Sequence, residues 1–108
     1  MVLERRRSQR VKSFFSVIIH RPYYEKNVEA TYLSLEGVMI NNAQKYYDIS
    51  QIVYLELVLL GGNSVSCEAK VVWVYPKSKN ASTYKLGLQF LNMDASNKEK
   101  LKAYFASI

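Results

Sequence analysis

Alternating apolar and polar residues along the second half of the chain predict β-strands. Between residues 53 and 73, apolar side chains occupy every second position on both sides of the break Gly61-Gly62-Asn63-Ser64. A period of two places these side chains on one face of each strand, and a glycine-rich break between two such runs is typical of a hairpin. The same period recurs over residues 84–90. The pattern therefore predicts a hairpin followed by one more strand.

Shorter extended segments precede this hairpin. The first is rich in aromatic and β-branched residues, which favour strands, and it ends before Pro22, which lacks a backbone donor. Gly37 precedes the third segment, where a bend or a close backbone approach needs a residue without Cβ. The predicted strands are residues 14–19, 28–33 and 38–40, and the predicted turn and loops are residues 23–27, 43–50 and 76–83.

Helical spacing appears only at the end of the chain. Leu101, Tyr104, Phe105 and Ile108 recur at i, i+3, i+4 and i+7, and Ser96-Asn97-Lys98-Glu99 matches a capping box with Ser96 as the N-cap. Six short strands and one terminal helix predict an all-β fold, a small antiparallel six-stranded split β-barrel with a C-terminal α-helix.

The length of 108 residues predicts a single domain. Its expected parts are a flexible basic segment over residues 1–12, the barrel over 13–92 and the helix over 95–108. Cys67 is the only cysteine, which excludes an intrachain disulfide and favours a reducing compartment. The sequence has neither the pattern of an export signal nor an apolar run of the ~18 residues that span a bilayer. We therefore expect a cytoplasmic protein without membrane insertion.

Charge is concentrated in the first dozen residues, MVLERRRSQRVK. This segment has five of the fifteen Lys and Arg residues and one acid, so it carries +4 of the formal net charge of +6. Arginine offers a planar fork matched to phosphate and a face that stacks on bases. The segment is therefore predicted either to bind an anionic ligand or to be a solvated tail, a common role for short basic ends.

The remaining polar residues give little support to catalysis or metal binding. His20 has no Cys or His at metal-ligand spacing, and neither Glu36 nor Asp48 is tied to a base or a nucleophile. Trp73 and Cys67 share the parity of the apolar positions, which predicts that both lie in the core. We expect a non-enzymatic protein without a metal site or a cofactor.

Two short motifs point to a ligand. Arg6-Arg7-Ser8-Gln9-Arg10 forms R-x-x-x-R, and Tyr32-Leu33-Ser34-Leu35-Glu36-Gly37 matches D/N-x-S-x-x-G at Ser34 and Gly37, with Tyr32 in place of Asp or Asn. These motifs, with Val71-Val72-Trp73-Val74 and Leu86-Gly87-Leu88-Gln89-Phe90 further along, resemble those of PilZ domains, bacterial cytoplasmic receptors for the dinucleotide second messenger cyclic di-GMP.

The resemblance implies a cyclic di-GMP site on the barrel and a separate protein effector as partner. Its ligand-binding residues would be Arg5, Arg6, Arg7, Arg10, Tyr32, Ser34 and Gly37. Arginine can grip the O6 and N7 acceptors of guanine, and several charge-assisted contacts would offset the cost of ordering the segment. Tyr32 cannot replace a carboxylate but can stack on a base. In the family, an arginine in the place of Arg5 is associated with binding an intercalated ligand dimer.

Two alternatives stay open at this point. The first is a degenerate PilZ-like interaction module that has lost cyclic di-GMP through Tyr32 and acts by protein contacts. The second is non-sequence-specific binding of RNA or single-stranded DNA by a basic barrel with exposed aromatics. The sequence does not predict the oligomeric state, the downstream process or the ligand stoichiometry.

Overall fold

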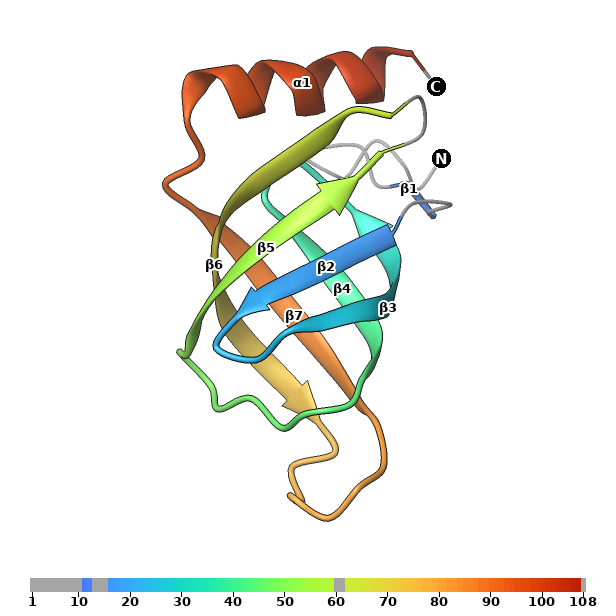
Figure 1. Cartoon of the computed structure of the whole chain (residues 1–108), viewed down its shortest axis with the longest axis vertical. Helices are drawn as coiled ribbons and strands as arrows, with labels where there is room; N and C mark the ends of the chain where they lie inside the picture. Colours follow the sequence, from blue (N-terminus) through green and yellow to red (C-terminus); the bar gives the residue numbers. More distant parts are fainter. Residues whose placement is uncertain (1–10, 13–15, 60–61, 108) are drawn as a thin grey trace, which may run out of the picture.

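A computed structural model describes residues 11–12, 16–59 and 62–107, and these residues form seven strands and one helix. Six of the strands close into an antiparallel barrel, and the helix covers one of its ends (Figure 1). In chain order the elements are β1 (Val11–Lys12), β2 (Ser16–Arg21), β3 (Glu25–Leu33), β4 (Gly37–Ala43), β5 (Ile52–Val58), β6 (Ser64–Tyr75), β7 (Tyr84–Leu91) and α1 (Ala95–Ala106).

The barrel closes through β3, which pairs with both β2 and β4. Around the barrel the neighbours run β3, β2, β5, β6, β7 and β4, and every pair is antiparallel. Closure removes the unpaired strand edges that would otherwise template association. The predicted six-stranded antiparallel barrel with a C-terminal helix is confirmed.

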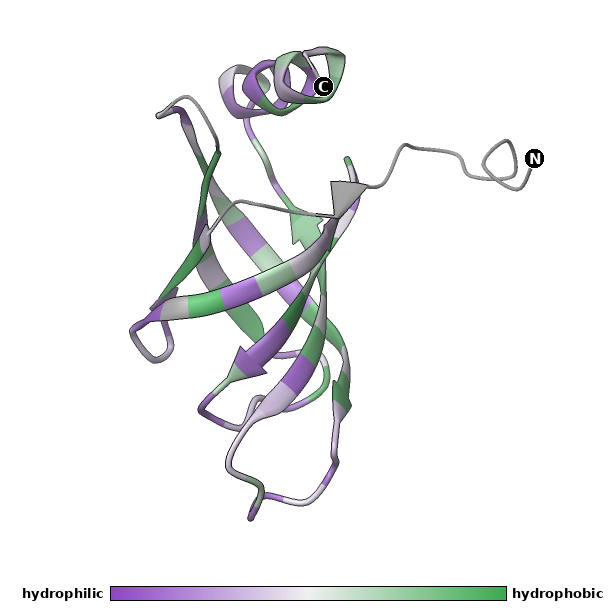
Figure 2. Ribbon diagram, turned by 90° about the vertical axis from the view of Figure 1, so that its right-hand side faces the viewer, coloured by the Kyte–Doolittle hydropathy of each residue, from purple (hydrophilic) through white to green (hydrophobic). Residues whose placement is uncertain are grey.

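The interior follows the predicted alternation of side chains, visible as alternating hydrophobic and hydrophilic bands along the strands in Figure 2. Inward residues of β5 and β6 are almost fully buried, among them Leu55, Leu57, Val65 and Cys67. The prediction that Cys67 lies in the core is confirmed, since its side chain is 4% exposed. Burial raises the pKa of its thiol to about 12, with a further contribution from the Glu68 carboxylate.

The alternation breaks in β6, and one sequence prediction fails as a result. The register of β6 with β7 shifts between Val71 and Trp73, so an extra residue enters β6 and the side chains that follow change faces. Val74 is buried, whereas Trp73 is 37% exposed. Trp73 therefore belongs to the outer face of the barrel, and its predicted core position is wrong.

Strand β3 begins at Glu25, within the segment predicted as a turn. Glu25 is buried because its carboxylate is satisfied: it accepts hydrogen bonds from the backbone N–H groups of Gln44 (2.7 Å) and Lys45 (3.2 Å) and from the Tyr47 hydroxyl (2.6 Å). Burial, and then this bond to Glu25, raise the pKa of Tyr47. A buried carboxylate with three donors holds the start of β3 against the loop after β4.

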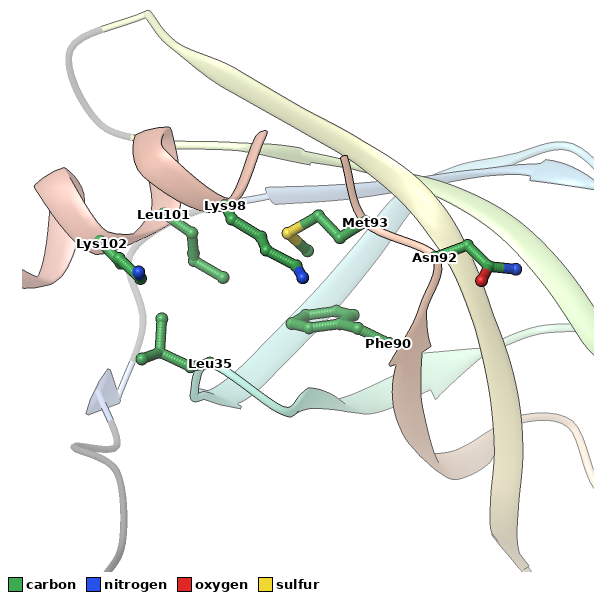
Figure 3. Close-up of a pocket in the computed structure, with 7 residues that line it drawn as sticks. All are labelled: Leu35, Phe90, Asn92, Met93, Lys98, Leu101 and Lys102. Atoms are coloured by element: carbon green, nitrogen blue, oxygen red, sulfur yellow. The ribbon is translucent and has the colours of Figure 1, made fainter. Parts of the chain in front are cut away.

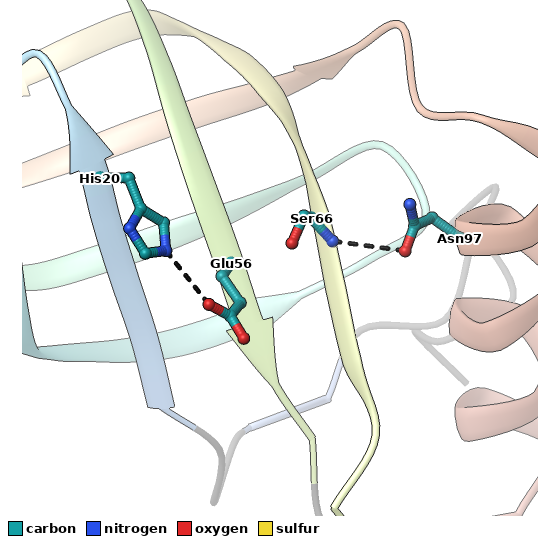
Figure 4. A network of polar contacts seen from close by, with 4 residues as sticks. All are labelled: His20, Glu56, Ser66 and Asn97. Atoms are coloured by element: carbon teal, nitrogen blue, oxygen red, sulfur yellow. Dashed lines mark hydrogen bonds and ion pairs between the residues drawn. The ribbon is translucent and has the colours of Figure 1, made fainter.

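The N-cap of helix α1 lies two residues before the predicted cap. Asp94 is the N-cap, and its side chain accepts a bond of 2.8 Å from the Asn97 backbone N–H, so the prediction of Ser96 as cap is wrong. The Asn97 side chain instead accepts from the Ser66 backbone N–H at 3.3 Å, which ties α1 to β6 (Figure 4). Leu101, Tyr104 and Phe105 are buried, as the helical spacing predicts.

No helix within the described residues is long and apolar enough to span a bilayer. The two residues of β1, which the sequence places at the end of the flexible basic segment, pair with the last two residues of β3. The rest of the predicted flexible segment, residues 1–10, lies outside the described residues.

Candidate functional site

The motif at Ser34 to Gly37 forms the tight turn between β3 and β4. The Ser34 backbone N–H donates to the Gly37 carbonyl at 2.9 Å. The Ser34 hydroxyl oxygen accepts from the backbone N–H groups of Glu36 (3.1 Å) and Gly37 (3.3 Å), and its proton faces the Glu36 carboxylate at 3.2 Å. A serine hydroxyl has one donor and two acceptor positions. The turn therefore uses the donor and both acceptor positions of this hydroxyl. A ligand oxygen could accept a hydrogen bond from it only by displacing the Glu36 carboxylate.

Gly37 is required by the packing of the barrel itself. A Cβ at this position would collide with the backbone carbonyl oxygen of Leu88 on β7, because β4 and β7 approach closely where Gly37 lies opposite Gln89. The same turn is fixed to β7 by a bond of 2.8 Å from the Phe90 backbone N–H to the Glu36 carbonyl. The motif glycine thus holds the turn rigidly against the neighbouring strand.

Strand β1 brings the end of the basic segment to this turn. Val11 lies opposite Leu33, and Lys12 lies opposite Tyr32. Leu33 is the residue directly before Ser34, and Arg10 is the residue directly before Val11 in the sequence. The pairing therefore fixes the point at which the basic segment joins the barrel beside the turn.

A row of outward-facing residues runs across four strands from this point. Tyr32 pairs with Met39, Met39 pairs with Gly87, and Gly87 pairs with Trp73, so the four share one face. Tyr32 and Trp73 are 36% and 37% exposed, and Met39 is half-buried. By the usual spacing between strands the row is ~15 Å long. We call Tyr32, Met39, Gly87 and Trp73 the aromatic row.

Gly87 leaves the space that the indole ring of Trp73 occupies in the aromatic row. A Cβ on Gly87 would overlap the indole ring of Trp73, so the ring lies directly over the glycine backbone. Glycine inside a strand often marks such a close approach. The indole therefore covers the Gly87 backbone while part of its surface remains exposed to solvent.

Polar residues border the aromatic row on the side of the turn. Gly37 pairs with Gln89, and Gln89 pairs with Lys70, so an amide and an ammonium group share the outer face with the row. Within the described parts of the chain, no three His, Cys, Asp or Glu side chains gather at metal-binding distance. His20 is paired with Glu56 at 3.1 Å on the outer face of β2 and β5 (Figure 4).

The structure brings together three of the predicted site residues, because Tyr32, Ser34 and Gly37 lie within six residues of one hairpin. Arg5, Arg6, Arg7 and Arg10 lie outside the described residues. The sequence prediction missed Trp73 and Met39. The sequence signal for this part of the site was Gly87, a glycine on the polar face of its predicted strand, where a neighbouring side chain can approach the backbone closely.

Comparisons with known proteins give a family and a fold. The sequence model of the PilZ domain matches residues 4–107. The Bacillus subtilis inhibitor of motility MotI (DgrA) superposes with a TM-score of 0.77 at 17% identity, over 94% of this chain and 50% of that one. YcgR of Escherichia coli, solved in complex with c-di-GMP, superposes with a TM-score of 0.72 at 18% identity, over 95% of this chain and 45% of that one.

A third structure, the PilZ domain of Escherichia coli YcgR with c-di-GMP, matches with a TM-score of 0.70 at 16% identity, over 94% of this chain and 90% of that one. The chain thus spans about half the length of MotI and of the longer YcgR structure. A search of the curated proteins gave no match.

Proposed function

The chain belongs to the PilZ domain family, and we propose on that basis that it is a non-enzymatic receptor for cyclic di-GMP in the bacterial cytoplasm. The nucleotide would lie between the arginines of residues 5–10 and the barrel surface formed by the turn at Ser34 and the aromatic row. Ordering of the basic segment over the nucleotide would then pass the signal to a separate protein.

The observation that carries this proposal is the pairing of Val11 with Leu33. A chain covers at most ~3.6 Å per residue, so the Cα of Arg6, five residues before Val11, lies within ~18 Å of it. The aromatic row begins at Tyr32, which is opposite Lys12. Both arginines of R-x-x-x-R can therefore reach the turn and the nearer part of the row.

The chemistry of these groups fits the nucleotide. Arg6 and Arg10 would bind guanine edges or phosphate as charge-assisted forks, with Arg5 or Arg7 assisting. Tyr32 and Trp73 are aromatic and partly exposed, and base stacking on such side chains contributes ~1–3 kcal/mol per base. Tyr32 would thus replace the polar contact of the usual Asp or Asn with a stacking contact.

Isothermal titration of the purified protein tests the proposal. We expect saturable heat with cyclic di-GMP and none with cyclic di-AMP, which has the same phosphates but lacks the guanine O6 acceptor. The absence of binding at tens of micromolar nucleotide, a limit equivalent to ~7 kcal/mol of affinity, would reject it. A steep salt dependence without preference for cyclic di-GMP would favour nonspecific nucleic-acid binding instead.

Tyr32 supports one other candidate function, a PilZ domain that works by protein contacts alone. Its single hydroxyl oxygen cannot reproduce the two acceptor oxygens of a carboxylate. This candidate predicts that cyclic di-GMP leaves the protein unchanged while a protein partner still binds. The same titration separates the two.

A further inference from the structure

A groove opens between α1, the end of β7 and the turn after β3. It has a volume of about 380 Å³, near the lower end of the ~300–1,000 Å³ typical of ligand sites. Its apolar lining consists of Leu35, Phe90, Met93 and Leu101, and Lys98 and Lys102 lie beside it (Figure 3). We call it the helix groove. It is separate from the aromatic row, which lies on the outer face of β3, β4, β7 and β6.

Leu35 is the exposed apolar side chain of this groove. Leu101 is 1% exposed and Met93 is 9% exposed, whereas Leu35 is 40% exposed. The turn that bears Leu35 is fixed on both sides, by the Ser34 bonds and by the bond from Phe90 to Glu36. Leu35 is therefore held at the groove by a rigid backbone, and a partner side chain would find the site already formed.

The charged residues that line the groove are both lysines, Lys98 and Lys102. Lys98 and Lys102 are four residues apart on α1, so they lie on the same face of the helix, and their side chains extend over the groove (Figure 3). Lys102 approaches Glu99 at 3.8 Å, with both side chains largely exposed, which makes a weak pair. Over residues 16–59 and 62–107 the structure gives Lys98 no ion pair.

We propose that the helix groove docks an acidic segment of a partner protein, which inserts one bulky apolar side chain between Leu35 and Leu101. Two carboxylates of that segment would pair with Lys98 and Lys102. The two lysines are four residues apart, which corresponds to ~6 Å along the axis of α1. Carboxylates at i and i+4 of a partner helix, or at i and i+2 of an extended segment, match this spacing.

A peptide fits this site better than the other anions that a basic protein meets. The groove supplies two lysines, which act as point charges, and an apolar floor, and it offers no guanidinium fork among its lining residues. The proposal goes beyond the nucleotide site, because the groove shares only the turn that bears Leu35 with it. The other lining residues come from the end of β7, the segment that follows it and α1.

Selection from a random-peptide display library against the full-length protein tests the proposal, followed by fluorescence anisotropy with the synthetic consensus peptide. We expect a consensus with one Leu or Phe flanked by Asp or Glu. Leu35→Glu should lower the affinity for the consensus peptide at least tenfold, and the double variant Lys98→Glu/Lys102→Glu should lower it to a similar extent. The control Lys77→Glu/Lys85→Glu changes the net charge equally, at exposed sites outside the groove, and should bind within twofold of wild type.

Several results would overturn the proposal. A basic consensus, no consensus, or equal binding by the groove and control variants would each exclude an acidic partner here. Dimerisation in sedimentation that Leu35→Glu abolishes would assign the groove to a second copy of this chain. If the chain's own first residues occupied the groove, Leu3→Asp would release them. Tighter binding of the peptide by this variant would therefore assign the groove to that segment. Circular dichroism confirms that each variant is folded, and titration with cyclic di-GMP is scored separately, so failure of one proposal does not conceal the other.

Discussion

Val11 and Leu33 are antiparallel partners, and this pairing joins the basic segment to the barrel one residue away from Ser34. The two family motifs are more than twenty residues apart in sequence. The short strand β1 brings Val11, the residue that follows the first motif in the sequence, to the end of β3, directly before the second motif. The proposed receptor depends on this arrangement, because arginines that joined the barrel elsewhere would not reach the turn.

Arg10→Ala should lower the affinity for cyclic di-GMP by tenfold or more. Arg10 directly precedes the paired residue Val11, and a charge-assisted contact is worth ~1.5–3 kcal/mol. Lys77→Ala removes a positive charge from the loop after β6, at an exposed position outside the turn and the helix groove, and should bind within twofold of wild type. Isothermal titration gives both numbers, and equal losses in the two variants would mean that only net charge matters.

Trp73 provides a direct optical test, because it is the only tryptophan in the chain. Its ring lies over Gly87 on the outer face, in register with Met39 and Tyr32. Cyclic di-GMP should therefore quench the fluorescence of Trp73, and the midpoint of the quenching curve should match the Kd from isothermal titration. If one base stacks on the indole, Trp73→Ala should bind the nucleotide at least fivefold more weakly. An unchanged emission spectrum in the saturated complex would place the nucleotide elsewhere.

Gly37→Ala should destabilise the protein far more than Gly62→Ala. The new Cβ at Gly37 would collide with the Leu88 carbonyl oxygen, and relief requires β4 to move away from β7. We expect a loss of about 3 kcal/mol or more. Gly62 has a φ of 89° but open space around it, so the loss there should be about 1 kcal/mol. Urea denaturation of the two variants gives the comparison, and similar losses would contradict the close approach of β4 and β7.

The Cys67 thiol should make the barrel sensitive to alkali. Its pKa is raised to about 12 by burial, above the ~8.5 of an exposed thiol, so the folded state favours the protonated form. This stabilisation is complete below pH ~8.5 and is lost as the pH rises towards 12, by ~1.4 kcal/mol per pH unit.

The free energy of unfolding, measured in urea for wild type and Cys67→Ala, tests this assignment. The stability advantage of wild type at pH 8 should shrink by about 2 kcal/mol at pH 10. Tyrosine ionisation affects both proteins and cancels in the difference. Parallel pH profiles would show that the thiol does not titrate with folding.

Cys67 and Trp73 show which side-chain positions the alternation in the sequence predicts correctly and which it does not. Both have the parity of the core positions in one strand, and the prediction succeeds for Cys67 because β6 pairs regularly with β5 up to Lys70. It fails for Trp73 because a register shift against β7 follows Val71. The shift depends on the partner strand, which local alternation does not encode.

The helix cap and the site show the same limit. Asp94 and Ser96 are both good N-cap residues, and the choice depends on where β7 ends and on the Asn97 contact with Ser66. Ser34 and Gly37 were found from their motif, because the turn they form is local. The aromatic row was not predicted, because Tyr32, Met39 and Trp73 become neighbours only through the registers of β3, β4, β7 and β6.

Hydrogen exchange followed by mass spectrometry, with and without cyclic di-GMP, tests the central claim most directly, because it reports on the basic segment and the turn at once. We predict that the nucleotide slows exchange together in residues 5–12 and 32–37, since both would cover the same ligand. Arg10→Ala should abolish the effect in both. Unchanged exchange in residues 5–12 in a complex that titration shows to be saturated would contradict closure of the basic segment over the turn.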